Sequence, residues 1–186
     1  YTETFSEVTD TGFVQRQQIG GGSGDVHVER RWGCGAAGLG SEDYTDISVS
    51  QSNFKFKSLA HQGVLVPPPA DWKQGGVWDY SYDVSGEGQM PGSGNRSGAP
   101  SIETKGTIKV RNEIVAQEQV NVPAGNFGAW KVQSTITQNL QTKMGNMNVP
   151  TNVALKMDSW YAKDVGLIKS EIKDFGATTE LVSFAK

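Results

Sequence analysis

The chain has 186 residues, with 17 lysines and arginines against 20 aspartates and glutamates, and a formal net charge of −3. This balance argues against nucleic-acid binding, which needs clustered basic side chains to displace phosphate counterions. No apolar run reaches 18 residues, so we expect no transmembrane segment. A chain of this length can bury a core without disulfides or metal, and nothing in its composition calls for a cofactor.

The first third of the chain predicts short strands separated by glycine-rich turns. Apolar and polar residues alternate with period two, and helical periodicity is nearly absent. The expected strands are Tyr1–Val8, Phe13–Ile19, Asp25–Trp32, Tyr44–Val49 and Asn53–Ser58. Asp10-Thr11-Gly12 suits a hairpin turn, Gly20–Gly24 a flexible turn, and Gly33–Gly40 should end the third strand. The chain opens on a strand rather than a signal peptide, as a processed exported protein would.

A run of three prolines, Pro67–Pro69, divides the chain. Proline cannot donate to a central ladder, so the run predicts an extended connector. We expect one domain over residues 1–186, with sub-halves 1–66 and 70–186. Both halves open on an aromatic strand, so they are either related by duplication or alike by chance.

The second half predicts longer strands. They are Trp78–Val84, Ile102–Val122 (as one strand or two), Phe127–Leu140, Asn152–Ala162, Gly166–Asp174 and Thr178–Phe184. Gly86–Pro100 should be a mobile exposed loop, Val122–Asn126 a tight turn, and Gly145–Pro150 a polar break. About 11–12 antiparallel strands in a meander predict an all-β fold, as a curved sheet, a half-barrel or a barrel.

The C-terminal half carries a recognisable pattern. Val122-Pro-Ala-Gly-Asn-Phe127 is followed by Trp160-Tyr161-Ala162, Gly166-Leu-Ile-Lys169 and Glu180-Leu-Val-Ser-Phe184. This resembles the "VPAG-F … WYA-GVGLVK-E … ELVSF" pattern of a group of poorly characterised bacterial envelope proteins and lipoproteins. The group resembles the lipoprotein-carrier (LolA/LolB-like) half-barrels. The resemblance implies an envelope, periplasmic or extracellular location, and it supplies no catalytic or metal-binding residue.

The lone cysteine, Cys34, has two interpretations. It is either a small buried apolar residue, which we favour, or a reactive thiol beside Arg30 and Arg31. A zinc site would need His27 and His61 to converge with Cys34 or a carboxylate, and we expect none.

Other local signals are weak. Glu29, Glu42, Asp43 and Asp46 could bind calcium, but their spacing does not match the twelve-residue calcium loop. Asn95-Arg96-Ser97 fits the glycosylation acceptor pattern in the predicted loop. No nucleophile elbow or phosphate loop is present, so we predict no catalytic residue and no metal.

Aromatic residues are the best candidates for a binding site. Core packing accounts for most of them, but an exposed platform could grip an apolar ligand. The candidates are Trp72, Trp78, Tyr80, Tyr82, Trp130 and Trp160, with Trp72 expected to be the most exposed.

These features predict a non-enzymatic envelope or secreted domain that binds or scaffolds. It would hold a hydrophobic or lipid-like ligand against the concave face of its sheet. The alternative is a structural or assembly subunit whose edge strands contact protein partners. An uncharacterised hydrolase ranks third, and the oligomeric state cannot be read from the sequence.

Overall fold

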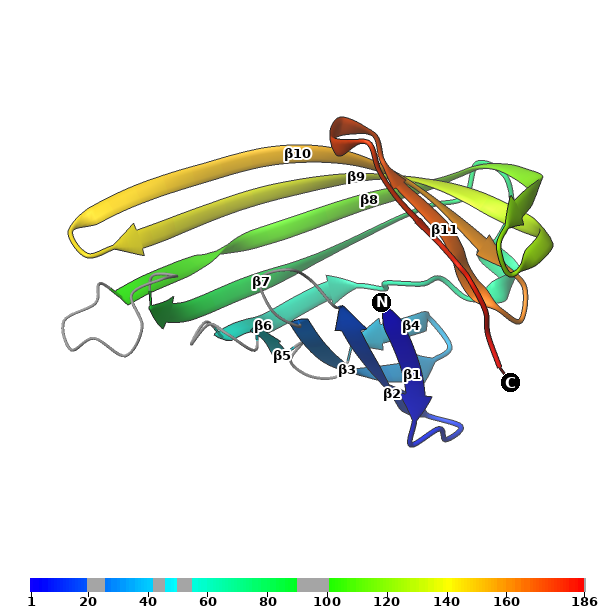
Figure 1. The fold of residues 1–186 in the computed structure, drawn as a ribbon, viewed down its shortest axis with the longest axis horizontal. Coiled ribbons are helices and arrows are strands. Elements are labelled where there is room, and N and C mark those ends of the chain that lie inside the picture. Colours follow the sequence, from blue (N-terminus) through cyan, green and yellow to red (C-terminus); the bar gives the residue numbers. More distant parts are fainter. Residues whose placement is uncertain (20–25, 42–45, 50–54, 90–100, 186) are drawn as a thin grey trace.

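The computed structural model describes residues 1–19, 26–41, 46–49, 55–89 and 101–185 (Figure 1). These parts of the chain form twelve strands and two short 3-10 turns, with no α-helix among them. In chain order the elements are β1 (Thr2–Ser6), β2 (Gly12–Ile19), β3 (Val26–Gly35), β4 (Gly38–Ser41), β5 (Asp46–Val49), β6 (Lys55–Gly63), η1 (Pro69–Asp71), β7 (Val77–Gln89), β8 (Ser101–Val122), β9 (Gly125–Met144), β10 (Met147–Ala162), β11 (Gly166–Ile172), η2 (Lys173–Phe175) and β12 (Ala177–Glu180).

The strands form one antiparallel sheet in the order β1-β2-β3-β5-β6-β7-β8-β9-β10-β11-β12, with β4 attached to β3. The all-β prediction and the curved sheet are confirmed. The sheet curls so that the long strands β7–β10 arch over the short N-terminal strands (Figure 1). It does not close into a barrel, because β1 and β12 stand at opposite ends of the order of paired strands.

Two irregularities bend the sheet at the end where β8 and β9 are joined. One residue of β8 is skipped between Ile114 and Ala116 in the pairing with β9. The pairing of β10 with β11 shifts between Trp160 and Tyr161. Bulges of this kind increase local twist, and they allow the long strands to fold over the N-terminal ones. The predicted tight turn holds, since Gly125 has a φ of 137°.

Strand alternation gives the sheet an apolar face and a polar face. On β7, Trp78, Tyr80 and Tyr82 share one face, and their partners on β8 are Asn112, Val110 and Ile108. The buried cluster Val84, Ile108 and Val110 lies on this side, with Tyr80, Tyr82, Ile136 and Leu140 packed against it. We call this the inner face. The opposite positions, which include Lys105, Lys109 and Arg111, are exposed and form the outer face.

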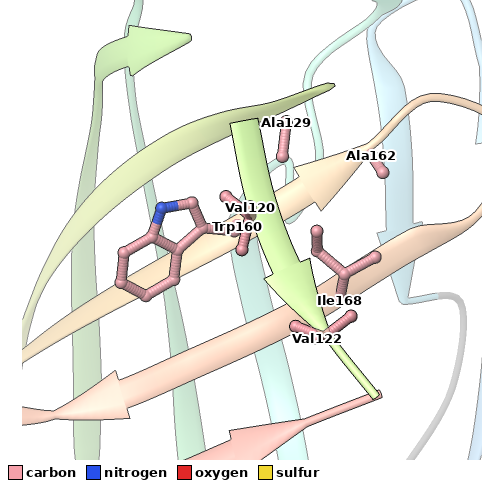
Figure 2. Close-up of a cluster of buried hydrophobic side chains, with 6 residues drawn as sticks. All are labelled: Val120, Val122, Ala129, Trp160, Ala162 and Ile168. Atoms are coloured by element: carbon pink, nitrogen blue, oxygen red, sulfur yellow. The ribbon is translucent and has the colours of Figure 1, made fainter. Parts of the chain in front are cut away.

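A second core lies on the outer face at the twisted end (Figure 2). Its buried members are Val120, Val122, Ala129, Trp160, Ala162 and Ile168. Ala129 and Ile136 are separated by seven residues on a continuously paired β9, so their side chains point to opposite faces. The chain after β12 covers this second core: Leu181 packs against it, and Phe184 meets Phe127 with ring centroids 6.1 Å apart.

Several expected breaks are strands instead. Gly86 and Gly88 continue β7, where they pair with Thr104 and Ile102, and residues 90–100 of the expected loop lie outside the described part. A ladder hydrogen-bonds through backbone groups, so glycine can occupy it. The glycine-rich segment after Trp32 forms the β3–β4 hairpin rather than ending the strand.

Proline is likewise tolerated in β10. Pro150 pairs with Gln141 of β9. On the other side of β10, the pairing with β11 begins only at Met157, so Pro150 has no β11 partner that needs its missing N–H. The proline connector joins β6 to β7, and these two strands pair directly with each other.

Candidate functional site

The inner face of β9 and β10 carries an apolar stripe that is only partly covered. The register places Leu155 opposite Ile136 and Val153 opposite Gln138. These positions are half-buried, and the stripe ends on Val149, which is 40% exposed, and Met147, which is 61% exposed. Alternating positions of β10, such as Asn152 and Ala154, are exposed on the outer face. The sheet is therefore amphipathic, and its apolar side is open at this end.

At the other end of the stripe, aromatic rings gather on the inner face. Trp72 lies 6.0 Å from Trp78 and 5.5 Å from Tyr161, and Tyr80 stacks on Tyr82 at 6.3 Å between ring centroids. All five side chains are half-buried. Edge and stacked contacts at these distances stabilise an aromatic cluster beyond the burial of its area.

The proline connector fixes the two indoles of this cluster. Trp72 Nε1 donates to the carbonyl of Pro67 at 3.1 Å. Trp78 Nε1 donates to the carbonyl of Leu65, also at 3.1 Å. The connector thus orients aromatic side chains as well as joining β6 to β7.

The N-terminal strands face this cluster across the curl of the sheet. Burial raises the pKa of the Tyr80 and Tyr82 phenols, and the guanidinium of Arg30 on β3 acts on both in the opposite direction. Burial also raises the pKa of Tyr161, and the negative charge of Glu3 on β1 adds to the rise. These interactions place β1 and β3 close to β7 and β10, in agreement with the arch in Figure 1.

The inner face also holds buried polar groups beside the rings. Asn112 is opposite Trp78 and is 5% exposed. Ser134 Oγ donates to Asn112 Oδ1 at 2.7 Å. In the described part of the chain, Asn112 Nδ2 has no hydrogen-bond partner. An unpaired buried donor costs about 1–3 kcal/mol, so an acceptor supplied from outside would be stabilised here.

Four of the six aromatic residues predicted as a binding site therefore come together: Trp72, Trp78, Tyr80 and Tyr82. Trp130 is opposite Tyr161 in the register and so shares their face. Trp160 does not. It is 5% exposed in the outer core, donates to Glu118 and lies beneath the ammonium groups of Lys131 and Lys169.

Sequence reasoning missed Tyr161 and Arg30. Tyr161 is adjacent to Trp160, and alternation requires the two to point to opposite faces; the sequence does not say which is inside. The proximity of Arg30 to the phenols depends on the curl of the sheet, which no local pattern encodes.

Two depressions of the surface lie mostly against outer-face positions of the sheet. One, of about 600 Å³, is bounded by Gln62, Asp79, Lys109, Arg111 and Thr135, mostly outer-face positions. The other, of about 580 Å³, lies against Thr2, Thr4, Arg16, His27 and Glu29 on the N-terminal strands. Most of the residues that line both depressions are polar or charged.

Cys34 is exposed, so its interpretation as a buried apolar residue was wrong. It lies one pair from the tip of the β3–β4 hairpin, opposite Leu39. Within the described residues no group of three His, Cys, Asp or Glu side chains could hold a metal. The candidate calcium ligands Glu42 and Asp43 and the sequon at Asn95 lie outside the described residues.

Comparison with known proteins adds a family. A model of the DUF3108-like family matches residues 89–184, which include β8–β12. The chain belongs to the DUF3108-like family. The match covers the strands that carry the apolar stripe of this DUF3108-like protein. It also covers both named parts of the sequence pattern, Val122–Phe127 and Trp160–Ala162, in full.

One solved structure matches the chain weakly. It is a Bacteroides fragilis NCTC 9343 protein described as a "putative exported protein with YmcC-like fold". It shares 18% identity with a TM-score of 0.39, over 95% of this chain and 89% of its own. No curated protein matches the chain. Among the described residues, no helix combines the length and apolar character needed to cross a membrane.

Proposed function

We propose that this DUF3108-like chain is a non-enzymatic envelope or secreted domain that holds a hydrophobic, lipid-like ligand against its inner face. The observation that carries the proposal is the open apolar stripe on β9 and β10, from Met157 to Met147. An apolar surface left uncovered on one side of an amphipathic sheet is typical of a ligand or interaction site. The aromatic cluster at the closed end would bound the ligand there.

The envelope location rests on the resemblance of the C-terminal pattern to bacterial envelope proteins. Lipoprotein-carrier half-barrels hold acyl chains against a curved sheet, and the same geometry serves the function proposed here. The curled, unclosed sheet supports this likeness, because it leaves one side accessible along the stripe.

Native mass spectrometry of the protein purified from its own host tests the proposal. We expect a bound species of lipid mass that is lost after extraction with organic solvent. The delipidated protein should then bind a polarity-sensitive hydrophobic dye, N-phenyl-1-naphthylamine. A species that carries no lipid and does not bind the dye would refute ligand binding.

Two adjacent residues of β10 provide a matched pair of variants. Val153 points to the inner face and is half-buried, whereas Ala154 points to the outer face and is exposed. Val153→Lys should weaken dye binding at least about tenfold, because the loss of an apolar contact and the burial of an amine together cost more than about 1.4 kcal/mol. Ala154→Lys adds the same charge on the outer face and should bind as the unmodified protein does.

The assembly-subunit alternative predicts a different result from the same protein. A protein partner would cover the inner face, so the native species would elute as a larger complex and would carry no lipid. That outcome, with dye binding only after the partner is removed, would favour the assembly subunit over the ligand carrier.

A further inference from the structure

Within the described strands, the inner face carries the guanidinium of Arg30 on β3 and the carboxylate of Glu3 on β1. The side-chain amides of Gln15 and Gln17 donate to Glu3, so Arg30 is the charged group there that can attract an anion. We infer that the ligand is an amphiphile with an anionic head group and a long alkyl chain, and that Arg30 binds the head group. The inference rests on the proposed function and specifies the chemical class of its ligand.

The pairing register places Arg30 on the inner face. Gly86 on β7 is opposite Phe56 on β6, Phe56 is opposite Ile47 on β5, and Ile47 is opposite Val28 on β3. Directly opposite residues share a face of the sheet, so position 28 is on the inner face, as position 86 is. Arg30 is two residues beyond Val28, so its side chain points to the same side. The neighbouring Trp32 lies beneath the guanidinium, with 5.3 Å from Cζ to the ring centroid.

Within the strands that the structure describes, the remaining arginine and lysine positions alternate onto the outer side. Arg31, next to Arg30, is one of them, and it pairs with Glu7 at 3.3 Å. Arg30 is therefore the single arginine or lysine that these strands present to a ligand on the inner face. Its five N–H groups can serve an incoming anion in addition to protein partners.

Further donors lie on the same face. The phenols of Tyr80 and Tyr82 are close enough to Arg30 for their pKa values to respond to its charge. Burial keeps both phenols protonated, so each can donate a hydrogen bond. Asn112 Nδ2, opposite Trp78 in the register, is a buried donor that has no hydrogen-bond partner among the described residues. Each of these groups would donate to an oxygen of an acidic head group.

The alkyl chain has a path away from these donors. From Met157 to Met147 the inner positions of β10 are apolar except Thr151, and none is charged. Ten residues of strand span about 33 Å at about 3.3 Å per residue, enough for a long extended chain. The chain end would reach Val149 and Met147, where the stripe is open.

Three ligands with the same sixteen-carbon chain test the head-group assignment: palmitate, hexadecanol and hexadecyltrimethylammonium. Each displaces N-phenyl-1-naphthylamine from the delipidated protein, below its own micelle concentration. We expect palmitate to bind at least about tenfold more tightly than hexadecanol, as expected of one charge-assisted hydrogen bond, and the cation to bind most weakly.

Variants then separate charge from packing. Arg30→Gln should weaken palmitate binding about tenfold and hexadecanol binding much less, whereas Arg30→Lys should keep most of the preference. Arg31→Gln removes an equal charge from the outer face and should change neither ligand. A second variant, Asn112→Leu, should reduce the preference for palmitate and keep hexadecanol binding.

The outcomes distinguish the two proposals. Equal binding of all three ligands, or an equal loss of palmitate and hexadecanol binding in Arg30→Gln, would overturn the head-group inference and leave hydrophobic binding standing. Failure of every ligand to displace or bind would overturn the proposed function itself.

Discussion

Asp158 is the charged group whose removal should reveal most about the stability of the sheet. Its side chain is 5% exposed on the outer face of β10. Lys131 Nζ of β9 lies 3.2 Å from its Oδ2, and Lys173 Nζ of the η2 turn lies 3.0 Å from the same atom. The carboxylate therefore ties β9, β10 and η2 together.

The two contacts differ in strength. The Lys131 side chain is 24% exposed, so its hydrogen bond to a buried carboxylate is worth about 1.5–3 kcal/mol. Lys173 is 53% exposed and screened by solvent, so it adds about 0–1 kcal/mol. Asn in place of Asp158 relieves the cost of burying a charge, which offsets part of the loss. We expect Asp158→Asn to lower the free energy of unfolding by about 1–3 kcal/mol at pH 7.

The pH dependence tests the cause. Burial alone would raise the pKa of Asp158, but the hydrogen bonds and charges of Lys173 and Lys131 lower it overall. A carboxyl whose folded pKa is below its unfolded value of about 3.9 stabilises the fold above that pH. This stabilisation disappears as the pH falls through the folded pKa.

Urea unfolding, followed by tryptophan fluorescence, measures the difference between the two proteins. The difference should be largest at pH 7 and should shrink below about pH 4. Asp79→Asn serves as the control, because Asp79 and Arg111 form an ion pair at 3.2 Å with both side chains more than 60% exposed. It should change the free energy of unfolding by less than about 1 kcal/mol. A difference for Asp158→Asn that is the same at pH 7 and pH 3 would refute the ion-pair explanation.

Three further predictions concern packing, backbone and the thiol. Ile168→Ala should cost about 2–5 kcal/mol of unfolding free energy, because Ile168 is fully buried. Leu167→Ala, at the exposed neighbour, should cost less than about 1 kcal/mol. Equal effects of the two changes on urea unfolding would contradict the assignment of Ile168 to the outer core. Gly63→Ala should lower the melting temperature far more than Gly75→Ala, since both have φ near 80° but only at Gly63 would a Cβ lie 2.3 Å from a β7 carbonyl oxygen. Cys34 should react with a thiol reagent in the folded protein as fast as in urea, and protection in native buffer would show that it is covered.

Local pattern predicted much of this fold because a strand alternates with period two whatever its neighbours are. The aromatic residues of β7 share a face for that reason, and the turn at Pro123 and Gly125 follows from the backbone preferences of proline and glycine. The predicted breaks were wrong where a strand ladder tolerates glycine or proline. Gly88 pairs within β7, and Pro150 lies at a free edge of β10.

The sequence predicted only part of the candidate site, for a related reason. Alternation divides residues between two faces but does not say which face the rest of the chain will cover. Trp160 and Tyr161 are adjacent; the sequence analysis chose Trp160 as a candidate, whereas Tyr161 is the one that lies in the inner aromatic cluster. The bulge in the β10–β11 pairing and the C-terminal segment that covers the outer core decided between them.

The sequence by itself thus determined an antiparallel β chain with long C-terminal strands and a row of aromatic side chains on one face. The tertiary structure decided that the sheet curls without closing, which brings Arg30 to phenols more than 45 residues away in the chain. Such contacts depend on the summed twist of many paired strands. No short segment contains that information, because each strand contributes only a small rotation and the site forms from their total.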